Sequence, residues 1–208
     1  MADRNVEALT APLYVGNGAN RAKINTDGTF TVEGTATAWN DIRASLIGSK
    51  LLENQGTVDY NFSENSVTFQ QNGDITDNDD VVLMNFQMPH DAMTSSPFRF
   101  HIHWHQVNTN VIQWTLEYRV QSNGGAKDTT WTVVNVPATG TANLFTYTSG
   151  TLNQITKLVE IDTTGFGISA VIQIRLTRSD STGGSVDAYF LDAHYMIDSL
   201  GSSEEYVK

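Results

Sequence analysis

The feature that most constrains the fold is a two-residue alternation of apolar and polar side chains between residues 98 and 120. The first run alternates apolar with ionisable residues, in the order Phe98, Arg99, Phe100, His101, Ile102, His103, Trp104, His105. After the polar segment 106–110, the apolar positions of the second run are Ile112, Trp114, Leu116, Tyr118 and Val120. This period is that of a β-strand with one buried face. Two such runs joined by a short polar segment predict a β-hairpin.

Similar short runs, separated by turn residues, recur along the rest of the chain. We expect strands at 29–33, 58–62, 66–70, 81–88, 131–136, 144–147, 158–162, 170–178 and 187–197. Residues 38–46 are the best candidate for a short helix, with Asn40 or Asp41 as its N-cap. This pattern predicts an all-β fold, a jelly-roll-type antiparallel β-sandwich formed by residues 28–208 as one domain. Residues 1–27 contain no clear element and are expected to form an extended N-terminal arm.

The composition excludes several classes of partner and site. The chain carries 12 Lys+Arg against 23 Asp+Glu, a formal net charge of -11, so neither nucleic acid nor an anionic membrane is an expected partner. No apolar stretch is long enough to span a bilayer, and the first residues lack the basic and then apolar layout of a secretory signal. We therefore expect synthesis in the cytoplasm. With no cysteine, disulfides, thiolate metal sites and cysteine nucleophiles are excluded.

The polar face of residues 98–106 carries three histidines. In the predicted hairpin, His101 lies opposite Glu117 and His103 opposite Thr115, so three imidazoles and a carboxylate share one face. Imidazoles two residues apart on a strand point the same way and can converge on a metal ion or form a pH-sensitive subunit contact. The alternative is that they fill a half-buried sheet face or an interface. We favour this alternative, because a metal site needs a further ligand that the sequence does not identify.

The last predicted strand, residues 187–197, separates its side chains in the same way. Its odd positions are expected to be buried, namely Tyr189, Leu191, Ala193, Tyr195 and Ile197. Asp192, His194 and Asp198 share the opposite, polar face.

No motif assigns a catalytic residue. The pair His101 and His103 invites comparison with the first motif of cupins, but the glutamate that should follow is replaced by the segment 107–109, and the later proline-glycine motif with its histidine is missing. A Gly-x-Ser-x-Gly elbow and a phosphate-binding Gly-x-x-x-x-Gly-Lys-Ser/Thr loop are also missing. We expect no enzyme activity, no cofactor and no bound metal. A metal-dependent jelly-roll enzyme, with Glu117 as the extra ligand, remains a less favoured alternative.

Five short segments, in this order, resemble a group of tailed-bacteriophage virion proteins. The segments are Trp39-Asn40-Asp41-Ile42-Arg43, Gln87-Met88-Pro89-His90, His101-Ile102-His103-Trp104, Trp114-Thr115-Leu116-Glu117-Tyr118, and His194-Tyr195-Met196-Ile197-Asp198-Ser199-Leu200-Gly201-Ser202. The resemblance implies a trimeric β-sandwich that is assembled into the particle and has no enzymatic activity. Head decoration, head spike, collar and tail all remain open as its location.

This resemblance sets the expected partners and sites. We expect a homotrimer located in the virion, whose N-terminal arm contacts other virion proteins of the capsid, the portal and neck, or the tail. Symmetric subunits bring one residue from each chain to a common axis. The candidates for such an interface or histidine cluster are His90, His101, His103, His105, Glu117 and His194.

The alternative function is a receptor-binding or carbohydrate-binding module that recognises a host-surface glycan. Aromatic residues are numerous enough to form a sugar-stacking platform. However, Trp104 and Trp114 occupy apolar positions of their strands, where core packing is the expected role. Trp39 and Trp131 are left undetermined by the pattern.

Overall fold

The computed structural model describes residues 10–46, 50–51, 58–70, 81–106, 112–137, 144–146, 153–179 and 184–200. Within these residues the chain forms β-strands and one short 3-10 helix, η1 (Gly34–Ala36). In chain order the strands are β1 (Leu13–Asn17), β2 (Asn20–Ile24), β3 (Phe30–Glu33), β4 (Ala38–Ser45), β5 (Lys50–Leu51), β6 (Val58–Asn61), β7 (Ser66–Phe69), β8 (Val82–Gln87), β9 (Phe98–Gln106), β10 (Gln113–Gln121), β11 (Thr132–Pro137), β12 (Leu144–Thr146), β13 (Asn153–Ile161), β14 (Val171–Arg178) and β15 (Val186–Ile197).

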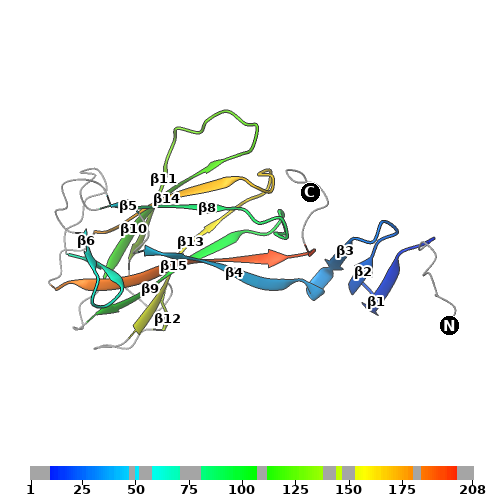
Figure 1. Ribbon diagram of the computed structural model, residues 1–208, viewed down its shortest axis with the longest axis horizontal. Coiled ribbons are helices and arrows are strands. Elements are labelled where there is room, and N and C mark those ends of the chain that lie inside the picture. Colours follow the sequence, from blue (N-terminus) through cyan, green and yellow to red (C-terminus); the bar gives the residue numbers. More distant parts are fainter. Residues whose placement is uncertain are drawn as a thin grey trace.

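The main body is a sandwich of two antiparallel sheets, and a smaller sheet projects from one end (Figure 1). One layer has the strand order β11-β10-β14-β8-β5. The other has the order β12-β13-β9-β15-β7-β6, and β4 pairs along β15. The predicted jelly-roll-type β-sandwich is therefore confirmed.

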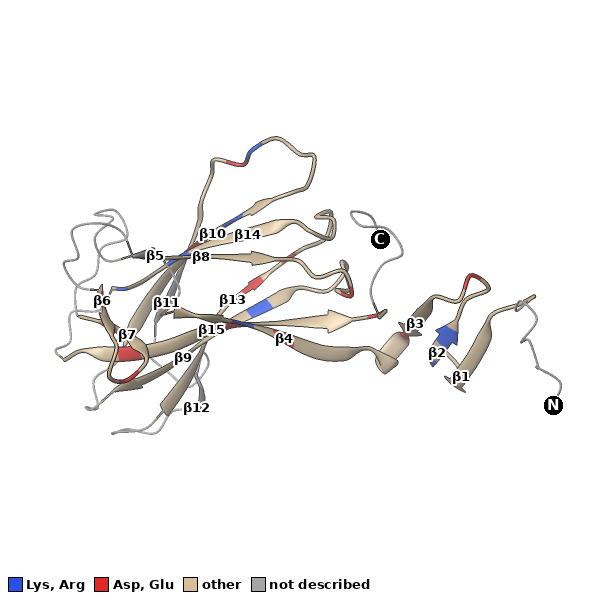
Figure 2. Ribbon diagram, in the orientation of Figure 1, with Lys and Arg blue, Asp and Glu red and all other residues tan. Residues whose placement is uncertain are grey.

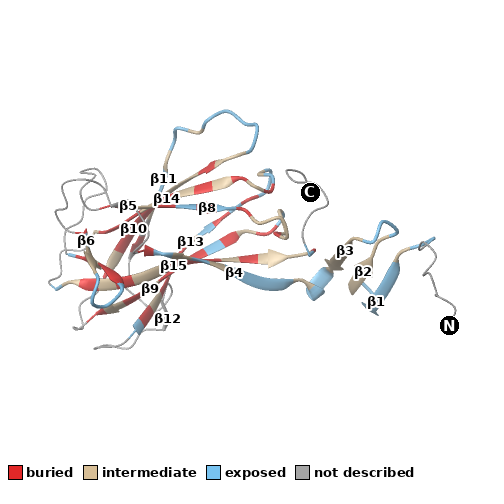
Figure 3. Ribbon diagram, in the orientation of Figure 1, coloured by how far each residue is buried: buried red, intermediate tan, exposed pale blue. Residues whose placement is uncertain are grey.

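The alternating residues of β9 and β10 supply the centre of the core, as their pattern predicts. Trp104 and Trp114 are 1% and 0% exposed. Their rings meet edge to face with centroids 6.1 Å apart, and Phe69 packs on Trp114 in the same manner at 5.2 Å. Figure 3 shows the buried residues concentrated between the two layers. Burying each such side chain contributes about 1.5–3 kcal/mol, so this face stabilises the sandwich.

The predicted hairpin between these two strands is wrong. β9 pairs with β13 and β15 in one layer, whereas β10 pairs with β11 and β14 in the other. The connection between them therefore crosses from one sheet to the other. Alternation identifies the buried face of a strand but not its neighbour, because both arrangements bury the same residues.

The predicted helix at residues 38–46 is also wrong. These residues form β4, which pairs with β15 from Ala38 opposite Ile197 to Ser45 opposite Phe190. Asn40 hydrogen-bonds the Tyr195 hydroxyl across the two strands instead of capping a helix. Tertiary pairing has overridden a weak local signal. Within the described residues, no helix has the length and apolar character needed to cross a membrane.

β15 is the longest strand and changes its register once. It pairs with β9 along one edge and with β7 and then β4 along the other. The pairing with β9 shifts between Ala188 and Phe190, which places a β-bulge at Tyr189. Leu191, Ala193 and Tyr195 are buried as expected, but Tyr189 and Ile197 are only partly buried. The bulge explains why the buried side chains change from the even positions Val186 and Ala188 to the odd positions Leu191, Ala193 and Tyr195.

The N-terminal region has more structure than predicted. Residues 13–24 form the antiparallel pair β1 and β2, although the sequence offered no clear element there, and β3 completes a three-stranded sheet. This sheet, residues 10–37, is called the arm below. It projects beyond the sandwich in Figure 1 and contacts the end of β15 through Val32 N–H, which donates to the Asp198 carbonyl at 2.6 Å. No described residue from 10 to 45 is buried.

A matched pair of leucine substitutions distinguishes the buried core of the sandwich from the exposed arm by their effects on stability. Leu191 of β15 is fully buried, whereas Leu13 of β1 is 48% exposed. Leu191→Ala is expected to lower the free energy of unfolding by about 2–5 kcal/mol, because it leaves a cavity in the core. Leu13→Ala should change it by less than about 0.5 kcal/mol. Chemical denaturation of both variants measures the difference, and equal losses would contradict the assignment of the core.

Candidate functional site

A buried polar site lies on the outer face of the larger sheet, where three strands meet. Cross-strand pairing puts Arg43 of β4 opposite Asp192 of β15, and Asp192 opposite His101 of β9. Residues two positions away on the same strands add His194 and His103 to this face. Four residues, His101, His103, Asp192 and His194, are called the histidine-aspartate cluster below.

Two imidazoles of this cluster, those of His101 and His103, approach one carboxylate oxygen. Asp192 Oδ2 lies 3.3 Å from His101 Nε2 and 3.7 Å from His103 Nε2. The two Nε2 atoms are 3.0 Å apart. The His194 ring packs edge to face on His101, with centroids 4.6 Å apart. These side chains cover Asp192, which is only 2% exposed although it points away from the core.

Charge and burial oppose each other at this carboxylate. Burial raises the pKa of Asp192, but hydrogen bonds from His101 and His103, followed by the positive charges of His101 and Arg43, outweigh it. The net pKa is well below its usual value, so Asp192 is ionised at neutral pH. Burial lowers the pKa of His194, and the neighbouring His101 lowers it further. The cluster therefore combines one anion with several imidazoles, which is a ligand set for a positive charge.

Two hollows flank the cluster. A cavity of about 370 Å³ is lined by Trp39, Arg99, Phe100, His101, Ile155, Lys157 and His194. A second one, of about 350 Å³, includes His103 and Phe190 in its wall. Solvent therefore reaches the buried imidazoles from both sides. Trp39 is 44% exposed, and the Arg99 guanidinium lies 4.5 Å from the centre of its ring.

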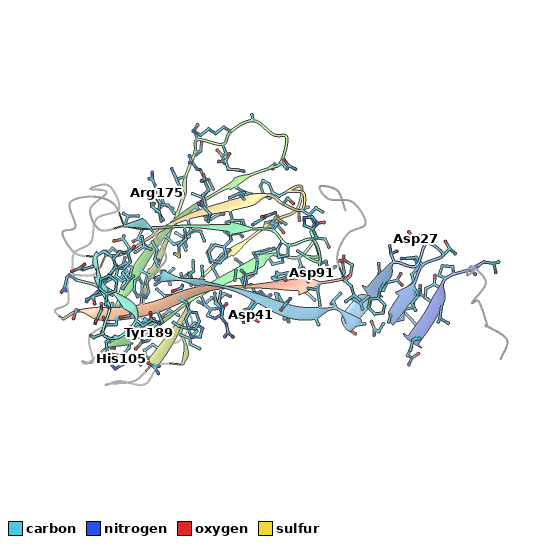
Figure 4. All side chains as sticks on the ribbon, viewed as in Figure 1. Asp27, Asp41, Asp91, His105, Arg175 and Tyr189 are labelled. Atoms are coloured by element: carbon cyan, nitrogen blue, oxygen red, sulfur yellow. The ribbon has the colours of Figure 1, made fainter. Side chains whose placement is uncertain are left out.

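The structure brings together only some of the residues predicted for a histidine cluster. His101, His103 and His194 meet at Asp192, and the further ligand that the sequence could not identify comes from β15. Glu117 lies in the opposite layer, where its carboxylate accepts a hydrogen bond from Arg175 Nη1 at 3.2 Å, so the predicted pairing with His101 is wrong. In Figure 4, Arg175, which binds Glu117, lies well apart from Asp41, the residue directly opposite His194 in the pairing of β4 with β15.

The two remaining predicted histidines lie outside this cluster. His105 is opposite Asp187 near the far end of β9, as its label in Figure 4 shows. His90 follows β8, and its Nε2 lies 2.9 Å from the Ser169 hydroxyl. A role of any of these histidines at a subunit interface stays a prediction.

Sequence reasoning missed the residues that surround the cluster. Arg43 and Trp39 were assigned to a helix, and Asp192 was noted only as polar. The cue was present in the alternation of β15, which puts Asp192 and His194 on one face. What the sequence lacked was the pairing of β15 with β9 and β4, which no local pattern specifies.

Comparisons with known proteins give no family assignment. No protein-family model matches the chain, and no curated protein matches its sequence. Among solved structures, the CBM36-1 domain of a multidomain xylanase from the hindgut metagenome of Trinervitermes trinervoides aligns with 13% identity and a TM-score of 0.42, over 74% of this chain and 96% of that one. TmCBM61 in complex with beta-1,4-galactotriose aligns with 14% identity and a TM-score of 0.28, over 77% of this chain and 88% of that one. Such scores assign neither a family nor a ligand to this chain.

The Tyr195 hydroxyl joins β4 and the segment after β8 to β15, next to the cluster. It accepts a hydrogen bond from Asn40 at 2.9 Å and donates to Asp91 at 3.2 Å. Tyr195→Phe should lower the free energy of unfolding by about 1 kcal/mol, because both partners lose a bond in a partly buried place. Tyr14→Phe, on the exposed strand β1, is the control and should have almost no effect. Denaturant unfolding compares the two, and an unchanged Tyr195→Phe midpoint would refute this role.

Proposed function

We propose that this protein is a non-catalytic structural component of a tailed-bacteriophage particle. In this proposal it assembles as a homotrimer, and its arm docks on a neighbouring virion protein or subunit. The observation that carries the proposal is the arm itself, a sheet that projects from the sandwich without a core of its own.

The contacts that the structure describes within one chain do not cover the arm. A small sheet needs a hydrophobic face that is covered, because backbone ordering costs about 1–2 kcal/mol per residue. None of the described arm residues is buried. Its outer strand β1 instead exposes three consecutive apolar side chains, Leu13, Tyr14 and Val15, at 48%, 45% and 66%. An edge strand of this kind is suited to pairing with, or packing on, another polypeptide.

Charged side chains of the arm hold strand β1 in a defined position relative to β2 and β3. Figure 2 shows basic residues on β2. Arg21 Nε lies 2.7 Å from Glu33 Oε2, and the Arg21 guanidinium packs over the Tyr14 ring at 3.9 Å. β2 is thus tied to both of its neighbours. The apolar edge of β1 is presented outward on an ordered support, which lowers the entropic cost of docking.

The segments that resemble virion proteins support the same proposal through their placement. Three of the five lie on adjacent strands: Trp39–Arg43 on β4, His101–Trp104 on β9, and the segment that begins at His194 on β15. Their outward side chains contribute His101, His103 and His194 to the histidine-aspartate cluster and Trp39 to the wall of the cavity beside it. The resemblance therefore centres on one outer face of the sandwich, next to the base of the arm.

Native mass spectrometry of the full chain tests the assembly. A trimer is expected. Val15→Asp should weaken or abolish it, because it puts a charge on the exposed apolar edge. Val133→Asp is the matched control, since Val133 is 53% exposed on the edge strand β11 of the sandwich. A monomeric wild-type chain, or a Val15→Asp trimer as stable as the control, would contradict docking through β1.

Removal of the arm tests incorporation into particles. A chain lacking residues 1–37 should keep the thermal midpoint of the sandwich but be missing from purified phage particles, because the deletion removes the docking strand and none of the described buried core. Mass spectrometry of the particles measures its amount against the full chain. Normal incorporation of the truncated chain would overturn the proposal.

Glycan recognition is the second candidate function, favoured by the cavity beside Trp39. An exposed indole next to Arg99 and Lys157 offers a stacking surface with hydrogen-bond donors. A glycan array should then show binding that Trp39→Ala removes and that Trp131→Ala, just before β11 of the other sheet, leaves intact. An array without a Trp39-dependent signal eliminates this candidate.

A further inference from the structure

Three donor atoms of the histidine-aspartate cluster lie at the separations that a tetrahedral metal ion requires. His101 Nε2, His103 Nε2 and Asp192 Oδ2 form a triangle with edges of 3.0, 3.3 and 3.7 Å. Zinc bonds to imidazole and carboxylate are about 2.0–2.1 Å long, so neighbouring ligands around a tetrahedral ion lie about 3.3 Å apart. A point at bonding distance from all three atoms therefore exists above the triangle.

His194 is the candidate for a fourth ligand. One donor atom each of His101, Asp192 and His194 lie within 4.8 Å of one another. Three imidazoles and one carboxylate are a ligand set for a tetrahedral ion that needs no contribution from another chain. His101 and His103 come from β9, and Asp192 and His194 from β15, so each strand contributes two ligands that are two residues apart and share a face.

A second observation concerns the other oxygen of the same carboxylate. Asp192 Oδ1 is buried and has no hydrogen-bond partner among the described residues, and Asp192 as a whole is only 2% exposed. An unpartnered buried carboxylate oxygen costs about 1–3 kcal/mol or more, because it is desolvated without compensation. A bound cation compensates the charge of this carboxylate. Arg43 approaches Oδ2 at 3.7 Å, but its side chain is 66% exposed.

The chemistry of the donors selects the class of metal. Imidazole nitrogens suit zinc and its transition-metal neighbours, whereas calcium and magnesium prefer shells made of oxygen. The other charged groups around the cluster are Arg43 and Asp41 on β4, and Lys157 and Arg99 on β13 and β9. Lys157 and Arg99 both lie within ion-pair distance of Glu160, so their positive charges are partly balanced.

We propose that His101, His103, Asp192 and His194 form a site for one divalent transition-metal ion, with zinc as the expected metal. The ion links β9 to β15, the two central strands of the larger sheet, from the outside. This site is independent of the proposed docking of the arm.

The test uses the full chain, prepared without a histidine tag and stripped with a chelator. Isothermal titration with Zn²⁺ should show one ion per chain, and Ca²⁺ should not bind at the same concentrations. Co²⁺ should give the intense visible absorption of tetrahedral coordination. The thermal midpoint should rise with Zn²⁺, because an ion that binds only the folded chain stabilises it.

Three variants and one control locate the site. Asp192→Asn, His101→Gln and His103→Gln should each weaken Zn²⁺ binding by more than about 100-fold, because even the outer partners of metal ligands contribute about 10- to 100-fold. His105→Gln, two residues further along the same face of β9, should bind as the wild type does. Circular dichroism shows which variants are folded. His103→Gln is informative if the buried positions do not tolerate substitution, because His103 is only partly buried.

Three results would overturn the site. The first is the absence of stoichiometric Zn²⁺ binding to the stripped wild-type chain. The second is unchanged affinity in folded His103→Gln or Asp192→Asn. The third is an equal loss of affinity in His105→Gln, which would indicate adventitious binding by surface histidines.

Discussion

The antiparallel pairing of β9 with β15 is the constraint on which the rest of the molecule depends. It places Trp104 and Leu191 on the inner face, where they join the core against the other layer. The same register places His101 opposite Asp192 on the outer face. One set of backbone hydrogen bonds thus determines both the stability of the sandwich and the position of this polar site. The bulge at Tyr189 allows β15 to satisfy this register while it pairs with β7 and β4 on its other edge.

The sequence predicts those features that depend on one strand at a time. Alternation alone identified the buried faces of β9 and β10, and it placed Asp192 and His194 together on β15. It failed where the answer depends on a partner strand. Glu117 was placed beside His101 because two alternating runs in succession resemble a hairpin, yet a crossover between sheets produces the same pattern. The helix assigned around Asn40 failed for the same reason, since pairing with β15 outweighs a capping residue.

The candidate site shows the same limit more sharply. The alternation identified His101 and His103 as two side chains of the cluster. The carboxylate of Asp192, which completes the cluster, lies almost ninety residues later in the sequence. Arg43 and Trp39 reach the same face from a third strand. A site assembled from three distant segments is visible only after the sheet order is known. The arm strands β1 and β2, in contrast, were missed because they bury no apolar face and so leave no alternation to detect.

The connection between the arm and the sandwich has a mechanical consequence. The arm leads through η1 directly into β4, and β4 runs antiparallel to β15 over eight paired residues. A pull on the arm along β4 loads these backbone hydrogen bonds in shear, so that they must break together rather than one after another. The junction is therefore stiff along the direction in which an attached neighbour would be held. It is compliant sideways, where the described contacts between the arm and β15 are few.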